Sequence, residues 1–135
     1  MSARTLVAGQ ASGQVLVLTE PLSFWGGVNA ETGELIDSHH PQLGSQLAGR
    51  VLLLPGGRGS SSSSSVLAEC IRNGVAPAAL LLATADPILA LGSLVAQEVY
   101  GVSIPVVVLA PAAYETFSRA QHLTIDAHPD STEIR

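Results

Sequence analysis

The sequence predicts one α/β domain built around a small parallel β-sheet. Its length of 135 residues is about that of a single domain, and an apolar content of 47% can supply a core. Between residues 51 and 109, strand-length apolar runs alternate with helix-like patterns. This order indicates parallel strands joined by right-handed crossovers. Strands from both ends would complete a barrel-like or layered domain over residues 1–135, and we see no internal repeat or domain boundary.

The first part of the chain predicts two strands and a long loop. Residues 4–8 and 14–18 are rich in Val, Leu and Thr, and the glycines between them favour a turn that would pair the two strands. Residues 19–49 show no sustained periodicity. Because an irregular segment of that length is uncommon in a compact domain, we expect it to have a function.

The remainder predicts repeated strand–helix units. The apolar run 51–54 predicts a buried strand, and 64–73 a helix that ends at Gly74 and buries Cys70 on its apolar face. The other expected elements are strands at 79–83, 106–109 and 123–126 and helices at 87–100 and 112–120.

The composition disfavours several classes of function. Eleven acidic residues against six arginines and no lysine give a net charge of −5, which argues against a nucleic-acid-binding surface. No apolar stretch reaches the roughly 18–20 residues that a membrane span needs, and the N-terminus lacks a signal-peptide pattern. With its single cysteine, the chain is expected in the reducing cytoplasm.

Charged residues are unusually scarce. They make up 13% of the chain, against about 25% in typical soluble domains. We therefore expect part of the surface to be covered by another chain or domain, the alternative being a compact, sparsely charged monomer.

The main functional candidate is the glycine-rich bend after the strand at 51–54. It carries Arg58 and leads through six consecutive serines, Ser60 to Ser65, into the helix. Backbone N–H groups, hydroxyls and a guanidinium at a helix start can bind an anion. A flexible serine linker is disfavoured, because the run joins a buried strand to a helix that packs on it. Helix capping by Ser60 or Ser61 alone is the alternative.

The same bend could activate a serine. A free hydroxyl is a poor base, but unpaired amides at the helix start, together with Arg58, would stabilise the alkoxide. The arginine fork also matches a carboxylate or a phosphate, and a solvated loop arginine is the alternative.

Two further segments hold residues of interest. Residues 21–27 contain the only tryptophan beside two glycines, and we interpret them as a loop anchored to the core by aromatic side chains, with a pocket or interface as the alternative. Adjacent His39 and His40 lack carboxylates at metal-binding spacing, so we expect both to face solvent in a turn. One cysteine cannot hold an iron–sulfur cluster, so any cluster would belong to a partner.

A larger set of residues, in order along the chain, carries a family resemblance. They are Pro21-Leu22-Ser23-Phe24-Trp25-Gly26-Gly27-Val28, Thr32-Gly33, Ile36-Asp37, His40-Pro41, Gly44, Arg58-Gly59-Ser60, Glu69, Gly74-Val75-Ala76-Pro77, Asp86, Gly92 and Ile104-Pro105. With these residues the chain resembles the swivel domain, or small subunit, of the aconitase X family over nearly its whole length.

The resemblance implies a compact swivelling β/β/α domain that closes over a larger aconitase-like subunit, forming a heterodimeric dehydratase active only when assembled. It implies that Ser60 is the general base and that Arg58, Ser61 and Ser64 contact the substrate. Ser61 is a rival for the base, because the serines follow one another without a break. No cofactor is expected on this chain, and an iron or iron–sulfur centre is expected on the large subunit.

The family is associated with two dehydrations of small hydroxy acids. One converts cis-3-hydroxy-L-proline to Δ1-pyrroline-2-carboxylate, and the other acts on mevalonate 5-phosphate. The alanine-rich, lysine-free composition is typical of GC-rich bacterial genomes and favours hydroxyproline. The alternatives from other classes are a non-catalytic anion-binding or regulatory domain and a purely structural subunit.

Overall fold

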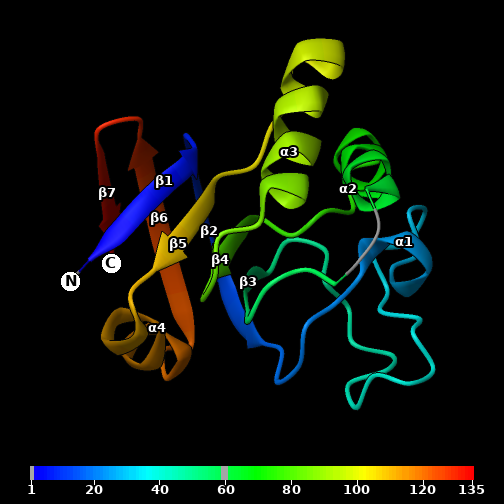
Figure 1. Cartoon of the computed structure of the whole chain (residues 1–135), viewed down its shortest axis with the longest axis horizontal. Helices are drawn as coiled ribbons and strands as arrows, with labels where there is room; N and C mark the ends of the chain where they lie inside the picture. The colour runs from blue at the N-terminus through cyan, green and yellow to red at the C-terminus, as the bar shows by residue number, and fades with distance from the viewer. Residues whose placement is uncertain (1, 59–60) are drawn as a thin grey trace.

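The computed structural model describes residues 2–58 and 61–135, and within them one sheet carries the helices on its two faces (Figure 1). The strands are β1 (Ala3–Val7), β2 (Gly9–Val17), β3 (Val51–Leu54), β4 (Ala79–Leu82), β5 (Val106–Leu109), β6 (His122–His128) and β7 (Ser131–Ile134). The helices are α1 (Phe24–Gly27), α2 (Ser62–Arg72), α3 (Pro87–Tyr100) and α4 (Pro111–Ser118). None of the described helices is both long and apolar enough to cross a membrane.

The sheet has the order β1-β5-β4-β3-β2-β6-β7. Strands β2, β3, β4 and β5 are parallel to their neighbours in the centre, whereas β1, β6 and β7 pair antiparallel at the two ends. The side-chain hydroxyls of Thr5 on β1 and Thr132 on β7 form a hydrogen bond, so the two ends of the sheet meet. The result is a nearly closed, barrel-like sheet, which confirms the predicted fold class.

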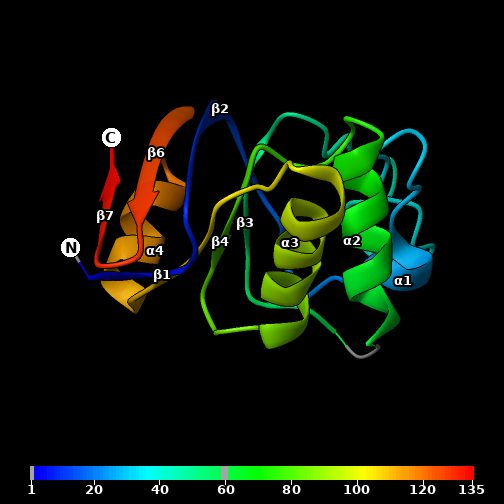
Figure 2. The ribbon, with the colours of Figure 1, turned by 90° about the horizontal axis from the view of Figure 1, so that it is seen from above.

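The central strands are buried because both faces of the sheet are covered (Figure 2). Alternate side chains point to opposite faces. Leu52 and Leu80 join the core under α2 and α3, whereas Leu53 and Leu81 join a second core with α4 and β6. This two-sided burial explains why β3 and β4 appear in the sequence as uninterrupted apolar runs.

Most of the expected elements are present with small shifts at their ends. The bounds of β3, α3 and β5 agree with the prediction, while α2 begins two residues earlier than expected, at Ser62. Gly74, with φ of 72°, follows this helix as expected. The long segment between β2 and β3 is irregular apart from the single turn of α1, and it packs on the core through Leu35 and Leu47.

Two predictions about the strands were wrong. The first two strands do not pair with each other, since β1 pairs with β5 and β2 lies between β3 and β6. The expected glycine turn is part of β2, where a Cβ on Gly13 would lie 2.4 Å from the carbonyl oxygen of Gly49. Gly13 therefore serves a close backbone approach and not a turn. The chain also continues beyond the expected last strand into β7.

Candidate functional site

The predicted serine-rich site lies where β3 leads into α2. Ser61 is the cap residue of α2, as the sequence indicated, but its side chain makes no capping hydrogen bond. The first turn of the helix holds no acidic residue. The expected base, Ser60, lies outside the described residues. Ser61 and Arg58, on either side of the undescribed pair, are both exposed.

The turn before the helix is held by two neighbouring segments. The backbone N–H of Gly57 donates to Oδ2 of Asp86 at 2.8 Å, and that of Arg58 donates to the carbonyl oxygen of Leu22 at 3.2 Å. A Cβ on Gly57 would lie 2.2 Å from the same Asp86 oxygen, so the turn requires glycine there. These two amides of the turn are therefore already paired; the unpaired amides expected from the sequence are those of the helix start that follows.

Asp86 joins the two parallel strand–helix units. Its Oδ1 accepts hydrogen bonds from the N–H groups of Ile88 and Leu89 in the first turn of α3, at 2.9 and 3.1 Å. With Oδ2 bound to Gly57, both carboxylate oxygens are occupied by backbone donors. Asp86 thus caps α3 and fixes the turn that carries Arg58.

A small hollow opens between the starts of α2 and α3. Its volume is about 180 Å³, including the open space at its mouth, and it is lined by Leu22, Gly57, Arg58, Ser63, Asp86, Ile88 and Leu89. Of the residues predicted to contact substrate, Arg58 lines this hollow, whereas Ser61 and Ser64 do not. The Ser64 hydroxyl donates to the Ser61 carbonyl at 2.8 Å, so it is partly engaged within the helix start.

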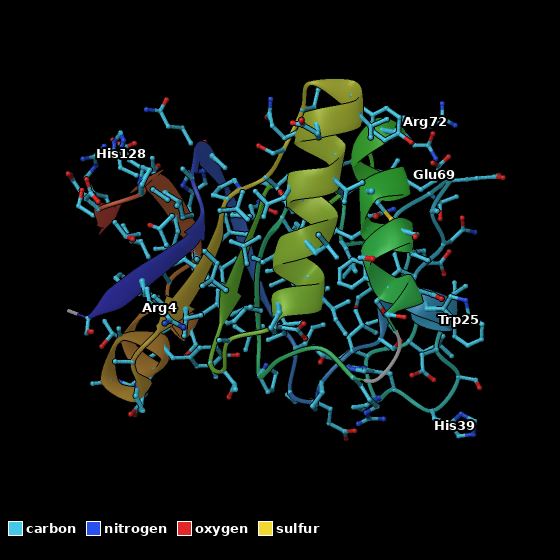
Figure 3. All side chains as sticks on the ribbon, turned by 45° about the horizontal axis from the view of Figure 1, so that its top comes forward. Arg4, Trp25, His39, Glu69, Arg72 and His128 are labelled. Carbon is cyan, nitrogen blue, oxygen red and sulfur yellow. The ribbon has the colours of Figure 1, made fainter. Side chains whose placement is uncertain are left out.

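The structure brings the aromatic loop at residues 21–27 against the same helix start. Phe24 is fully buried and anchors this loop, whereas Trp25 is 59% exposed. The backbone N–H of Trp25 donates to the hydroxyl of Ser63 at 3.1 Å. Trp25 lies beside the N-terminal start of α2, while Glu69 and Arg72 lie near the other end of that helix (Figure 3). The aromatic loop and the serine-rich helix start, which are far apart in sequence, therefore lie in contact.

Two residues that shape this site, Ser63 and Asp86, could not be recognised as such from the sequence. Their contacts reach 38 and 29 residues along the chain, to Trp25 and Gly57, so local patterns could not reveal them. One signal was present for Asp86: an aspartate directly before a proline is typical of a helix cap followed by the first helical position.

The paired histidines do not behave alike. His39 is exposed, as expected, but His40 is 5% exposed, so the prediction that both face solvent was wrong. The Gln42 N–H donates to Nδ1 of His40 at 3.1 Å, and Nε2 lies 3.3 Å from the Glu20 carbonyl oxygen. Both ring nitrogens therefore contact backbone groups of the loop, which explains why this polar side chain is buried.

Cys70 lies in the core as predicted, and burial raises the pKa of its thiol to about 11. Within the described ranges, no three His, Cys, Asp or Glu side chains come together in a group that could hold a metal ion. Near the end of α2, Nη2 of Arg72 lies 2.8 Å from Oε1 of Glu69 in a surface ion pair. The hydrogen bond from Arg72 lowers the pKa of the Glu69 carboxyl.

Comparison with known proteins identifies the family. The model of the aconitase X swivel domain matches residues 1–134. The chain belongs to this family. It also superimposes on the crystal structure of Thermococcus kodakaraensis aconitase X with a TM-score of 0.80 and 32% identity, covering 99% of this chain and 96% of that one.

Two groups of curated relatives are similar to this swivel domain. A cis-3-hydroxy-L-proline dehydratase of Pseudomonas aeruginosa is 57% identical over 106 residues, which cover 78% of this chain and 18% of the relative. A phosphomevalonate dehydratase small subunit of Methanothermobacter thermautotrophicus is 47% identical over 93 residues, covering 69% and 71%. The chain thus spans less than a fifth of the Pseudomonas protein, and 21% of the corresponding Hypocrea jecorina protein.

Proposed function

We propose that this chain is the swivel domain of a hydro-lyase that dehydrates cis-3-hydroxy-L-proline to Δ1-pyrroline-2-carboxylate. The observation that carries this proposal is the 57% identity to the Pseudomonas cis-3-hydroxy-L-proline dehydratase. The Hypocrea jecorina protein of the same name is 44% identical over 126 residues, which adds support from a second organism.

The start of α2 would supply this chain's part of the chemistry. Ser60, as the general base, would remove the proton from the carbon next to the substrate carboxylate. Exposed Arg58 suits a bidentate contact with that carboxylate. The hydroxyls of Ser61 and Ser64 would hydrogen-bond to the substrate, and Ser61 is the alternative base. The positive end of the helix dipole favours the anionic form of both base and substrate.

We propose that the iron centre expected for this family lies on the partner. The one thiol of this chain is buried with a raised pKa, which disfavours it as a metal ligand. When bound on the partner, iron would supply Lewis-acid polarisation of the substrate. The role of this chain would be to hold the base, to orient the carboxylate and to exclude water when the two parts close.

An exposed apolar surface supports the proposal of a large aconitase-like partner. The solvent side of α3 carries Leu91, Leu94 and Val99, which are 50%, 49% and 63% exposed. A further hollow of about 870 Å³, including open solvent, lies between this side of α3 and residues Arg4 and Leu6. Exposed apolar side chains grouped on one helix indicate a surface that another polypeptide covers. The matched relatives also contain far more chain than this domain.

Phosphomevalonate is the second candidate substrate, and the 47% identity to a phosphomevalonate dehydratase small subunit favours it. The same helix start and Arg58 could bind either a carboxylate or a phosphate, because each is a compact anion with at least two acceptor oxygens. The two candidates therefore differ in substrate but not in the part of this chain that they use.

The test is turnover by the chain assembled with its aconitase-like large subunit. The assembled complex should dehydrate cis-3-hydroxy-L-proline, and this chain alone should not. Dehydration of mevalonate 5-phosphate alone would replace the first candidate by the second. Turnover of neither compound, with phosphate binding to this chain alone, would support the non-catalytic anion-binding module and reject the enzyme.

A further inference from the structure

A buried hydroxyl joins the aromatic loop to the start of α2. Ser63, in the first turn of this helix, is 4% exposed, unlike the exposed Ser61 and Ser65 around it. Its oxygen accepts the backbone N–H of Trp25 and lies 3.2 Å from the hydroxyl of Ser23. The Ser23 hydroxyl in turn donates to the Trp25 carbonyl oxygen at 3.0 Å.

Each hydroxyl has one proton, which fixes the direction of each of these hydrogen bonds. The single proton of the Ser23 hydroxyl goes to the Trp25 carbonyl, so the Ser63 hydroxyl must donate to Ser23. The Trp25 N–H donates to Ser63 and completes the cycle. The three groups thus form a closed ring in which every donor has an acceptor, and such a ring is more rigid than separate contacts.

The ring is connected to the turn that carries Arg58 through the residue next to Ser23. Ser23 follows Leu22, whose carbonyl oxygen accepts the Arg58 N–H at 3.2 Å. Leu22, Arg58 and Ser63 all line the same hollow. A shift of the aromatic loop would therefore move the backbone partner of Arg58 as well.

We infer that Ser63 is a positioning residue of the candidate site. Through its ring with Ser23 and Trp25, it sets the aromatic loop against the start of α2 and so fixes the place of Arg58. This inference rests on the proposed function for its link to turnover, but the ring can be tested without any substrate. Trp25 is the only tryptophan of the chain, so its fluorescence reports on the loop alone.

The first experiment measures Trp25 in the full chain carrying Ser63→Ala. Loss of the ring should lower the fluorescence anisotropy of Trp25 and increase its quenching by acrylamide. Ser65→Ala is the matched control, because it makes the same change on an exposed side chain of the same helix. In the double mutant, Ser23→Ala should add little to Ser63→Ala, since both break one ring. Should Ser63→Ala fail to fold, Ser23→Ala alone should show the same increase in quenching.

The second experiment measures KM and kcat in the assembled complex with cis-3-hydroxy-L-proline and mevalonate 5-phosphate. Displacement of Arg58 should raise KM about 10-fold in Ser63→Ala, because misplacement of a binding group by 1 Å can cost up to about 10²-fold. A merely destabilised variant would contain less active enzyme and keep its KM. Equal values for Ser63→Ala and Ser65→Ala in an active complex, or additive effects on quenching, would overturn the inference. An inactive wild-type complex would instead overturn the proposed function.

Discussion

The two connections that lead from a central strand into a helix treat the helix start in different ways. The connection from β4 to α3 ends in Asp86, whose two oxygens accept three backbone N–H groups. The connection from β3 to α2 has Ser61 at the cap without a side-chain capping bond, and its helix has no acid in the first turn. Arg58 lies just before it.

This difference indicates which of the two helix starts can bind an anionic ligand such as a substrate carboxylate. The Asp86 carboxylate offsets the positive end of the α3 dipole and occupies its first amides. The first turn of α2 holds no acidic residue and Ser61 makes no side-chain capping bond, while Arg58 lines the hollow beside this helix start. The two helix starts border the same hollow. The lack of an acidic residue in the first turn of α2 therefore distinguishes the candidate site more sharply than its glycines do.

The largest effect among the tests of this comparison is expected for Arg58→Gln. Removing the guanidinium should raise KM about 10- to 100-fold in the assembled complex, since hydrogen bonds to charged groups are worth about 1.5–3 kcal/mol. Steady-state kinetics would measure the change. Arg72→Gln is the matched control, because Arg72 lies at the far end of α2 and is already paired with Glu69. An unchanged KM in Arg58→Gln would break the proposed link between α2 and the substrate.

A smaller effect, on stability, is expected for Asp86→Ala. The variant leaves the amides of Gly57, Ile88 and Leu89 without their acceptor, so the free energy of unfolding should fall by about 1–3 kcal/mol. Urea unfolding would measure this loss. Phosphate should then stabilise Asp86→Ala more than the wild type, because the start of α3 has become an open anion site.

Asp86→Asn is the control for that substitution. It keeps one acceptor oxygen of the same shape and should lose less stability than Asp86→Ala. Equal phosphate stabilisation of the wild type and Asp86→Ala would show that the carboxylate is not what separates the two helix starts.

The smallest effect concerns the buried side of α2. Burial raises the pKa of the Cys70 thiol in the folded chain from its ordinary value of 9.0 to about 11. As the pH rises between these values, the unfolded state binds fewer protons than the folded state, so the free energy of unfolding falls. Unfolding of wild type and Cys70→Ala at pH 8 and pH 10.5 would isolate this contribution. A parallel pH dependence in the two proteins would contradict the burial of the thiol.

Elements with a strong local pattern could be predicted from the sequence. Strand β3 and helix α3 have their expected bounds, because one is an apolar run buried on both faces and the other lies between a proline and a glycine. The pairing of β1 with β5 could not be predicted, since it depends on contacts across about 100 residues. Strand β7 was missed because Ser131–Ile134 is a short, half-exposed edge strand with little apolar signal.

The site was predicted in two halves but not as a whole. The glycine-rich turn and the aromatic loop were each recognisable from composition, whereas the hydrogen bonds that unite them join residues far apart in sequence. His40 illustrates the same limit, because the backbone groups that bury it come from residues 20 and 42. Local sequence indicates which residues can do chemistry, and tertiary contacts decide which of them meet.

The most direct test of the account is the turnover of the assembled complex carrying Ser60→Ala. Loss of a general base should lower kcat by about 10²–10⁴-fold, while circular dichroism and association with the large subunit stay as in the wild type. Ser61→Ala, measured beside it, should raise KM through the lost substrate contact but lower kcat far less than Ser60→Ala does. Normal turnover in Ser60→Ala with inactivity in Ser61→Ala would move the base by one residue, and normal turnover in both would contradict the claim that the start of α2 supplies it.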